Sequence, residues 1–235
     1  MKKTIDATPQ AFEIDTDHTA LWVIDVQPDF FERGGFADVG QGLDVRWVQP
    51  ILPSIREIVE LARTSGIQII FTREAYQPDL SDVPEPWLKA PENARIGSRG
   101  KENQGKWRFL IDGERGTELM IETKPEDIIL RKASKDAFVR PSIGNRRIDL
   151  LKKLRRLGLR QFLFTGATSG VCGASTISRS SDEGFESGII TDLMADYDHG
   201  IHAAAMKNAG GRDQKWPWIS ACLTTSEAVK RALAA

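Results

Sequence analysis

The sequence predicts a three-layer α/β fold of the Rossmann-like type, with a six-stranded, mostly parallel sheet and helices on both faces. Two observations lead to this prediction. Short continuous apolar runs, typical of strands buried on both faces, alternate with segments whose apolar residues recur at helical spacing. Strands that alternate with helices pair in parallel, and their right-handed crossovers place helices on both faces of the sheet.

Six apolar runs are the expected strands: residues 19–24, 67–72, 128–130, 162–164, 187–191 and 218–223. The helices are expected between and after them, over residues 48–65, 145–157, 172–183 and 199–208, with one more closing the chain. We find no internal repeat, and the chain of 235 residues has 40% hydrophobic content, enough for a sizeable core. Residues 1–235 are therefore predicted to form a single domain.

The first strand is apolar throughout and ends at Asp25. The loop after it contains Pro28 and the pair Gly34 and Gly35, which stop the strand from continuing. The second strand is followed by residues 73–126, a segment rich in proline, glycine and charge. We interpret this segment as a long insertion or lid within the same domain.

Two helix starts are predicted from capping residues. Asn145 is expected to cap the helix that runs to Leu157. Thr224 and Glu227 have the spacing of a capping box, which predicts the start of the closing helix.

The central strand, residues 162–164, leads through a glycine-containing turn into Cys172. A cysteine in the first turn of a helix lies near the positive end of the helix dipole and near free backbone N–H groups. Both features are expected to lower its pKa and favour the thiolate. The alternative is that Cys172 is a small buried residue at a helix start, since free cysteines are often buried.

Composition excludes several classes of partner. The net charge is −1, and lysine and arginine are spread along the chain, so we expect neither a nucleic acid nor a membrane as partner. Cys172 and Cys222 form no CxxC pair, which favours a reducing compartment. Residues 1–17 have no apolar targeting core, and no run is long enough to span a membrane. A cytoplasmic, homo-oligomeric protein (dimer or tetramer) with a small-molecule substrate is expected.

Asp25, Lys132 and Cys172 each follow a different predicted strand. Because ligands of parallel α/β sheets bind at the carboxyl ends of the strands, we expect these residues around one crevice. Each alone has a structural explanation: a turn acid, a solvated strand terminus and a core residue. Together they are the parts of a thiol hydrolase, in which Asp25 exchanges protons and Lys132 supplies positive charge. The backbone N–H groups of Thr168 and Cys172 are the expected oxyanion site.

Three ordered motifs resemble those of isochorismatase-like cysteine hydrolases. Residues 25–30 resemble their D-x-Q-x-D-F motif, and residues 166–172 resemble their G-x-x-T-x-x-C elbow. Lys132, Ser134 and Phe138 resemble their lysine segment K-x-x-x-[ST]-x-F, with Asp136 at the small-residue position. The resemblance spans residues 19–223. It implies a non-proline cis peptide bond between Ala167 and Thr168.

The same resemblance implies a reaction without metal or cofactor. Nicotinamidases of the family carry a D-x-H-x-x-H metal site, and the three histidines here, His18, His199 and His202, do not form that pattern. Residues 72–74 and 78–82 look most like the biuret hydrolase branch, which cleaves linear ureides. Residues 208–214 depart from the M-Q-G-G segment of that branch.

The resemblance thus implies a cysteine-dependent amidohydrolase that cleaves a C–N bond of a small linear ureide or carboxamide and releases ammonia or an amine. The alternatives are an isochorismatase-type vinyl-ether hydrolase and a non-catalytic binding homologue. The predicted substrate-binding residues are Phe30, Arg73, Ser169, Arg212 and Gln214. Arg212 is expected to favour substrates with an anionic end. Phe30 could equally be a core aromatic, and Arg212 could face solvent.

Overall fold

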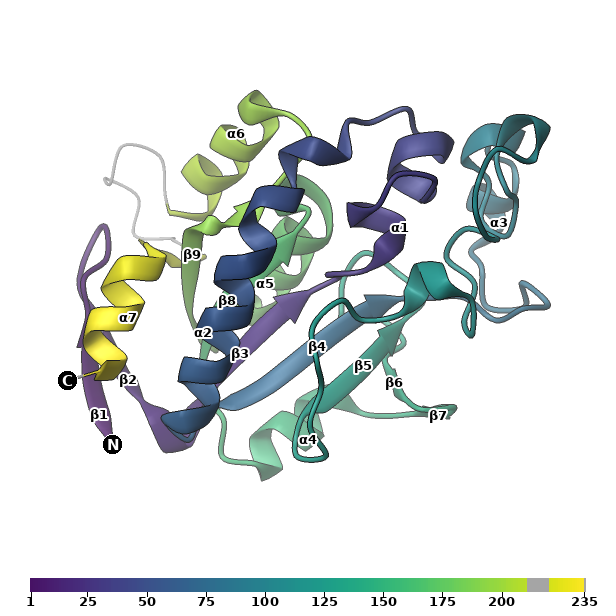
Figure 1. The fold of residues 1–235 in the computed structure, drawn as a ribbon. Helices are drawn as coiled ribbons and strands as arrows, with labels where there is room; N and C mark the ends of the chain where they lie inside the picture. The colour runs from purple at the N-terminus through teal and green to yellow at the C-terminus, as the bar shows by residue number, and fades with distance from the viewer. Residues whose placement is uncertain (211–219, 235) are drawn as a thin grey trace.

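A computed structural model of the protein describes residues 1–210 and 220–234. An eight-stranded sheet has the order β10-β9-β8-β3-β4-β5-β6-β7 (Figure 1). Six of these strands run parallel: β3 (Thr19–Ile24), β4 (Gln68–Glu74), β5 (Ile128–Lys132), β8 (Gln161–Ala167), β9 (Glu186–Ala195) and β10 (Cys222–Thr224). The α/β fold with a mostly parallel sheet is confirmed. The predicted strand over residues 218–223 begins outside the described residues, and its described part begins at Cys222.

The predicted number of six strands is wrong, because two short antiparallel strands extend the sheet beyond β5. They are β6 (Ser142–Ile143) and β7 (Arg146–Arg147), joined by a tight turn in which Gly144 has a φ of 56°. The turn contains Asn145, so this residue does not cap a helix. Helix α4 (Leu150–Arg156) begins instead after Asp149, whose side chain accepts the N–H of Lys152 at 2.9 Å.

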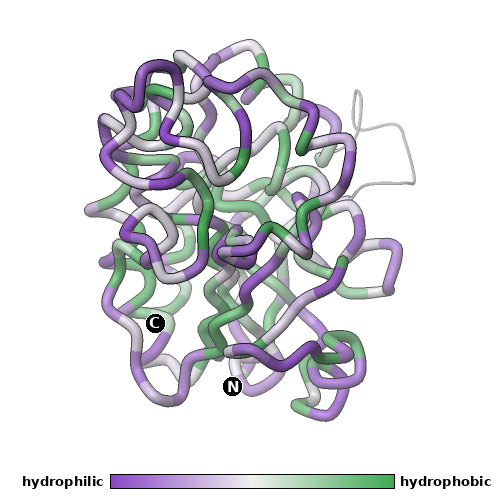
Figure 2. Tube along the Cα trace, turned by 90° about the vertical axis from the view of Figure 1, so that its right-hand side faces the viewer, coloured by the Kyte–Doolittle hydropathy of each residue, from purple (hydrophilic) through white to green (hydrophobic). Residues whose placement is uncertain are grey.

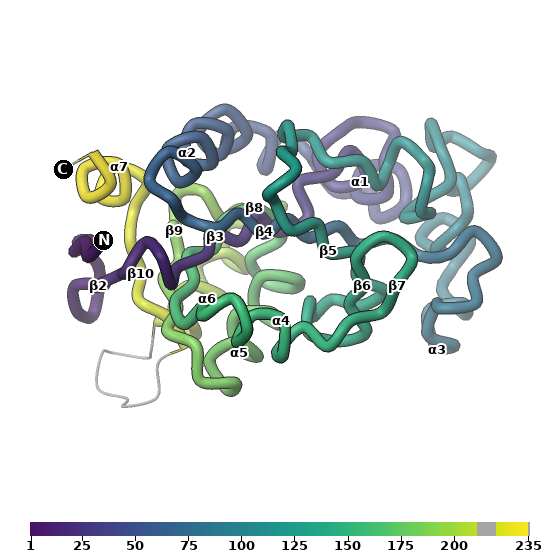
Figure 3. Tube along the Cα trace, turned by 90° about the horizontal axis from the view of Figure 1, so that it is seen from below, coloured from purple at the N-terminus to yellow at the C-terminus, as the bar shows by residue number. Residues whose placement is uncertain are grey.

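Helices cover both faces of the sheet, as predicted (Figure 3). Helices α2 (Leu52–Thr64) and α7 (Ser226–Ala234) lie on one face, and α4, α5 (Ala174–Asp182) and α6 (His199–Ala209) lie on the other. Strand β3 serves both layers: Leu21 and Val23 pack with the first pair of helices, and Trp22 packs with the second group. This explains why the strand is apolar from Ala20 to Ile24. Figure 2 shows these apolar strands at the centre of the molecule.

The closing helix is capped one residue later than predicted. Thr224 belongs to β10, and its hydroxyl donates to the carbonyl oxygen of Asp6 at 2.7 Å. The hydroxyl of Thr225 accepts the N–H of Ala228 at 3.3 Å. None of the helices in the described residues is long and apolar enough to cross a membrane.

A two-stranded antiparallel sheet at the N-terminus was not predicted from the sequence; β1 (Lys2–Ile5) and β2 (Phe12–Asp15) form it. The turn between these strands pairs with the edge of the main sheet. The N–H of Thr8 donates to the carbonyl oxygen of Leu223 at 2.8 Å, and the reverse bond is 2.7 Å long. The N-terminal segment therefore closes the β10 edge.

After β4 ends at Glu74, the 73–126 segment extends beyond the carboxyl ends of β4 and β5, where it includes the short helix α3 (Glu85–Leu88) (Figure 1). It then returns to the start of β4, where the side chain of Gln68 donates to the carbonyl oxygen of Glu126 at 3.0 Å. The segment contributes fully buried side chains, among them Tyr76 and Phe109. It is tied to strand β5 by an ion pair between Asp82 and Arg131, 2.7 Å long. These contacts attach the segment to the main core, and its opening as a lid stays a prediction.

Candidate active site

Asp25 follows the last residue of β3 in a left-handed backbone conformation with a φ of 47°. This conformation is uncommon for a residue other than glycine and often occurs at functional sites. The carboxylate is fully buried. Its Oδ1 accepts the hydroxyl of Thr72 at 2.7 Å, and its Oδ2 accepts no hydrogen bond from the described residues.

Lys132 ends β5, and its ammonium lies at the centre of a buried cluster. The Nζ atom lies 2.8 Å from Asp25 Oδ2, 3.4 Å from Glu74 Oε2 and 3.5 Å from Cys172 Sγ. It also donates to the carbonyl oxygen of Ser134 at 2.9 Å. Burial favours the neutral amine, but the charges of Asp25 and Glu74 outweigh it and raise the pKa of Lys132. The lysine is therefore a permanent cation in this cluster.

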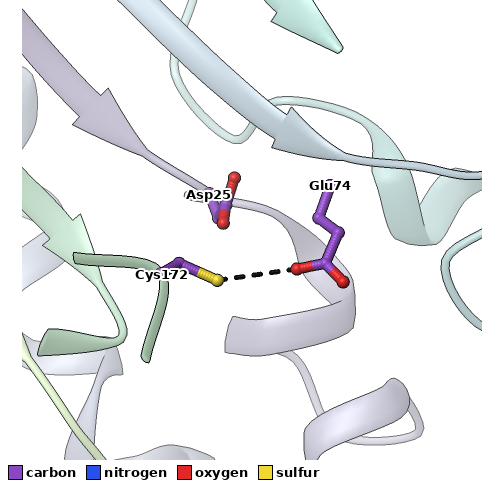
Figure 4. Close-up of side chains that lie close together, drawn as sticks. All are labelled: Asp25, Glu74 and Cys172. Carbon is purple, nitrogen blue, oxygen red and sulfur yellow. Dashed lines mark hydrogen bonds between the residues drawn. The ribbon is translucent and has the colours of Figure 1, made fainter. Parts of the chain in front are cut away.

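Cys172 lies in a wide π-helical turn over residues 169–173, just before α5 begins at Ala174. The side chain is buried, and its thiol donates to Glu74 Oε2 at 3.5 Å (Figure 4). The predicted lowering of its pKa is wrong. Burial raises the pKa of Cys172 well above the usual value, and the charge of Lys132 offsets this only in part. The cysteine is thus a neutral thiol that requires a base.

Sequence analysis missed Glu74, the last residue of β4, because the strand was expected to end at Thr72. Its side chain is fully buried. Oε1 lies 2.7 Å from Lys135 Nζ and accepts the hydroxyl of Tyr76 at 2.9 Å. Burial favours the protonated acid, but the charges of Lys135 and Lys132 outweigh it and lower the pKa of Glu74 to about 2. The two-residue alternation of strands, which puts Glu74 on the side of Thr72, could have revealed it.

The cluster is electrically balanced. Asp25 and Glu74 supply two carboxylates, Lys132 and Lys135 supply two ammonium groups, and the thiol is neutral. Transfer of the thiol proton to a carboxylate would leave the net charge unchanged. A buried site tolerates such an internal transfer better than the gain or loss of a charge.

Oxygen atoms of Asp25 and Glu74 and the sulfur of Cys172 lie within 4.8 Å of one another, an arrangement that could hold a cation. The ammonium of Lys132 lies within 3.5 Å of all three groups and already supplies that positive charge. Two of the three histidines lie elsewhere: His18 pairs with Asp15, and His199 packs against Trp47. His202 contacts Ser169 of the elbow. Catalysis without a metal stays a prediction.

The elbow has the predicted backbone geometry. The peptide bond between Ala167 and Thr168 is cis, and the N–H of Gly173 donates back to the carbonyl oxygen of Thr168 at 2.8 Å. Ser169 Oγ lies 3.1 Å from Nδ1 of His202 and donates to Asp196 Oδ2 at 3.3 Å. Ser169 thus joins the elbow to β9 and α6.

Phe30 and Arg73, two of the other predicted substrate-binding residues, both make structural contacts. Phe30 is buried in the core, where its ring packs edge-to-face on that of Phe36, with the ring centroids 6.4 Å apart. Arg73 occupies the opposite side of β4 from Thr72 and Glu74 and pairs with Asp112 at 2.8 Å. Arg212 and Gln214 lie outside the described residues.

Three residues of the D-x-Q-x-D-F motif have different roles in the structure. Asp25 joins the cluster, and Gln27 fixes the backbone of Glu74 through two hydrogen bonds of 2.7 and 3.1 Å. Asp29, in helix α1 (Pro28–Phe31), binds the 73–126 segment through the ring N–H of Trp107 and the backbone N–H of Leu110, both at 2.7 Å.

A family model described as the isochorismatase domain matches residues 19–214. The chain belongs to this family. It is 27% identical to a ureidoacrylate amidohydrolase RutB of Methylorubrum extorquens over 229 residues, which cover 92% of this chain and 85% of the relative. It is 31% identical to RutB of Caulobacter segnis over 180 residues, 74% of this chain and 70% of the relative.

Among solved structures, a cysteine hydrolase from Pseudomonas syringae pv. phaseolicola has the same fold. The TM-score is 0.73, the sequence identity is 18%, and the match covers 94% of this chain and 95% of the other. The membership of the isochorismatase family confirms the family that the three motifs indicated.

Proposed function

We propose that this chain is a cysteine-dependent amidohydrolase that cleaves a C–N bond of a small linear ureide or carboxamide, such as a biuret-like compound. Cys172 is the nucleophile, Asp25 is the general base and acid, and Lys132 is the cation between them. One observation carries this proposal: a thiol, a carboxylate and a lysine share one buried cluster, in which Lys132 Nζ lies 3.5 Å from Cys172 Sγ and 2.8 Å from Asp25 Oδ2. The relationship to RutB, whose name states a ureide substrate, supports the choice of substrate class.

In the first step, Asp25 Oδ2 takes the thiol proton while the sulfur of Cys172 attacks the substrate carbonyl carbon. The C=O electron pair moves onto the oxygen, which the backbone N–H groups of Thr168 and Cys172 stabilise. Each such donor contributes typically about 3 kcal/mol. Lys132 keeps its proton, and its charge favours the transient thiolate.

In the second step, the protonated Asp25 donates its proton to the leaving nitrogen as the C–N bond breaks. Ammonia or an amine departs, and the acyl group stays on the sulfur as a thioester or thiocarbamate. Water then attacks this carbonyl carbon and gives a proton to Asp25. The C–S bond breaks, and the sulfur takes that proton back, which restores the neutral thiol.

The proposal is tested by measuring ammonia release from biuret, ureidoacrylate, N-carbamoylglycine and simple primary carboxamides. Cys172→Ala should lower kcat/KM for the best substrate by at least about 1000-fold. Cys222→Ala is the matched control, because Cys222 is also buried but lies in β10. It should stay within about twofold of the parent. Undiminished turnover by Cys172→Ala would refute the proposed nucleophile.

A further inference from the structure

The two oxygens of Glu74 have different surroundings. Oε1 is occupied by two short contacts, at 2.7 Å to Lys135 Nζ and at 2.9 Å to the hydroxyl of Tyr76. Oε2 has two long contacts, at 3.4 Å to Lys132 Nζ and at 3.5 Å to Cys172 Sγ. A carboxylate oxygen has two lone pairs and forms its strong hydrogen bonds at about 2.7–2.9 Å. Oε2 therefore retains capacity for a strong donor beside the nucleophile.

We propose that Glu74 Oε2 accepts a hydrogen bond from the nitrogen that leaves, and so selects substrates that end in a primary carbamoyl group, –CO–NH2. This inference rests on the proposed function and makes it narrower: the product released is ammonia. Glu74 recognises the leaving group by accepting its N–H, whereas Asp25 supplies the proton that the leaving nitrogen takes.

The geometry allows one nitrogen to contact both acids. One oxygen of Asp25 and one oxygen of Glu74 lie within 4.8 Å of each other and of Cys172 Sγ. A nitrogen that forms hydrogen bonds of about 2.9 Å to each can bridge oxygens up to about 5.8 Å apart. The leaving nitrogen can therefore reach both carboxylates while its carbonyl carbon is next to the sulfur.

The charge of Glu74 suits this task. Lys135 and Lys132 keep the pKa of Glu74 at about 2, against the effect of burial, so it acts as an acceptor and not as a proton source. As Asp25 transfers its proton and the C–N bond breaks, the nitrogen gains positive character and its N–H groups become stronger donors. An ether oxygen in the same place has no hydrogen to offer and would face a carboxylate. The arrangement thus disfavours a vinyl ether.

The test compares two leaving groups in Glu74→Gln. One substrate is the best primary ureide of the panel, and the other is its S-methyl thiocarbamate, in which CH3S replaces the terminal NH2. The amide oxygen introduced by the substitution would accept from Lys135 and Tyr76, which turns the amide NH2 toward the sulfur. We expect kcat/KM for the ureide to fall about 30-fold or more and that for the thiocarbamate to fall less than about threefold.

Asp82→Asn is the matched control. It removes a buried carboxylate that lies away from the thiol and forms an ion pair with Arg131, 2.7 Å long. It should leave the ratio of the two kcat/KM values unchanged. An equal loss for both substrates in Glu74→Gln would overturn the inference and leave Glu74 as a charge-balancing residue. Turnover that survives in Cys172→Ala would instead refute the proposed function.

A second measurement uses the parent enzyme and does not depend on the folding of the variant. N-methylation of the terminal NH2 leaves one N–H, and N,N-dimethylation leaves none. We expect the second methyl group to lower kcat/KM at least about tenfold more than the first, because it removes the last donor to Glu74. Equal losses for the two methyl groups would contradict the inference.

Discussion

Asp25 and Asp29 are separated by only four positions, and both are fully buried, yet their surroundings differ. Asp25 Oδ2 is paired with the Lys132 ammonium at 2.8 Å and has no neutral hydrogen-bond donor among the described residues. Both oxygens of Asp29 accept neutral N–H donors, from Trp107, Leu110 and Phe36, at 2.7 to 3.0 Å. Burial raises the pKa of Asp29 to about 6, although these hydrogen bonds oppose the shift.

We propose that this difference separates an acid that takes part in the chemistry from an acid that holds the structure. In this proposal Asp25, whose Oδ2 has the Lys132 ammonium beside it at 2.8 Å, takes the proton of the thiol. Asp29, whose two oxygens accept three ring and backbone N–H groups, instead anchors the 73–126 segment. Burial alone does not distinguish the two residues, whereas their hydrogen-bond and ion-pair partners do.

The largest expected effect is that the same substitution lowers kcat at Asp25 but lowers stability at Asp29. Asp25→Asn should lower kcat at least about 1000-fold, because an amide cannot take the thiol proton. It should also slow alkylation of Cys172 by iodoacetamide. Asp29→Asn should keep kcat within about threefold and lower the free energy of unfolding by about 1–3 kcal/mol, because its NH2 would face an N–H donor. Equal effects on kcat would remove the distinction between the two acids.

The second prediction concerns Lys132, the cation that pairs with Asp25 and has no counterpart at Asp29 among the described residues. Lys132→Met leaves Asp25 and Glu74 as neighbouring buried carboxylates without their shared partner. Removal of one side of a buried ion pair typically costs about 3–5 kcal/mol. We expect that loss in the free energy of unfolding measured with urea at pH 7. A loss below about 1 kcal/mol would show that the lysine is not needed to balance the cluster.

The third prediction is a pH dependence of opposite sign for two acids. The pKa of Asp29 is about 6 in the folded chain and 3.8 in its usual state, so the folded state binds more protons between these values. The stability contribution of Asp29 therefore falls as pH rises from about 4 to 6, by up to about 3 kcal/mol. The pKa of Glu74 is lowered from 4.5 to about 2, so its contribution is present above pH 4.5 and is lost toward pH 2.

Urea unfolding of the parent and of Asp29→Asn between pH 2 and 7 checks both pH dependences. The variant should lose the decline between pH 4 and 6 and keep the loss of stability in stronger acid. If the two proteins show the same slope from pH 4 to 6, Asp29 does not titrate in that window.

The smallest effect is expected at the surface above Asp29. Arg115 pairs with Glu32 at 2.9 Å and lies 6.0 Å from the centre of the Trp107 ring. Both members of this ion pair are partly exposed, so Arg115→Ala should lower the free energy of unfolding by less than about 1 kcal/mol. A loss above about 2 kcal/mol in the free energy of unfolding, measured by heat or urea, would mean that the hydrogen bonds of Asp29 to the 73–126 segment depend on Arg115.

The sequence predicts the six parallel strands because each is apolar enough to be buried on both faces. It predicts that Asp25, Lys132 and Cys172 lie together because all three follow such strands. It does not predict β6 and β7, since two-residue edge strands carry no hydrophobic pattern. The cap at Asn145 fails for a related reason: asparagine suits both a helix start and the tight turn that it occupies here.

The fine structure of the site is beyond the sequence pattern. The depth of burial of Cys172, which reverses the expected direction of its pKa, depends on packing by distant segments. Glu74 enters the site because β4 continues two residues past its apolar run, and strand alternation then directs Arg73 to the other side. The contrast between Asp25 and Asp29 requires the positions of Trp107 and Leu110, which are about 80 residues away in the chain.

The most direct test of the central claim is intact-mass spectrometry of the parent enzyme, quenched with acid during turnover of its best ureide. A covalent intermediate predicts a mass increase equal to the acyl group, on the peptide that contains Cys172 and absent from the one that contains Cys222. Cys172→Ala should show neither adduct nor ammonia release. Ammonia release at the parent rate by Cys172→Ala, without any adduct, would contradict nucleophilic catalysis by this residue.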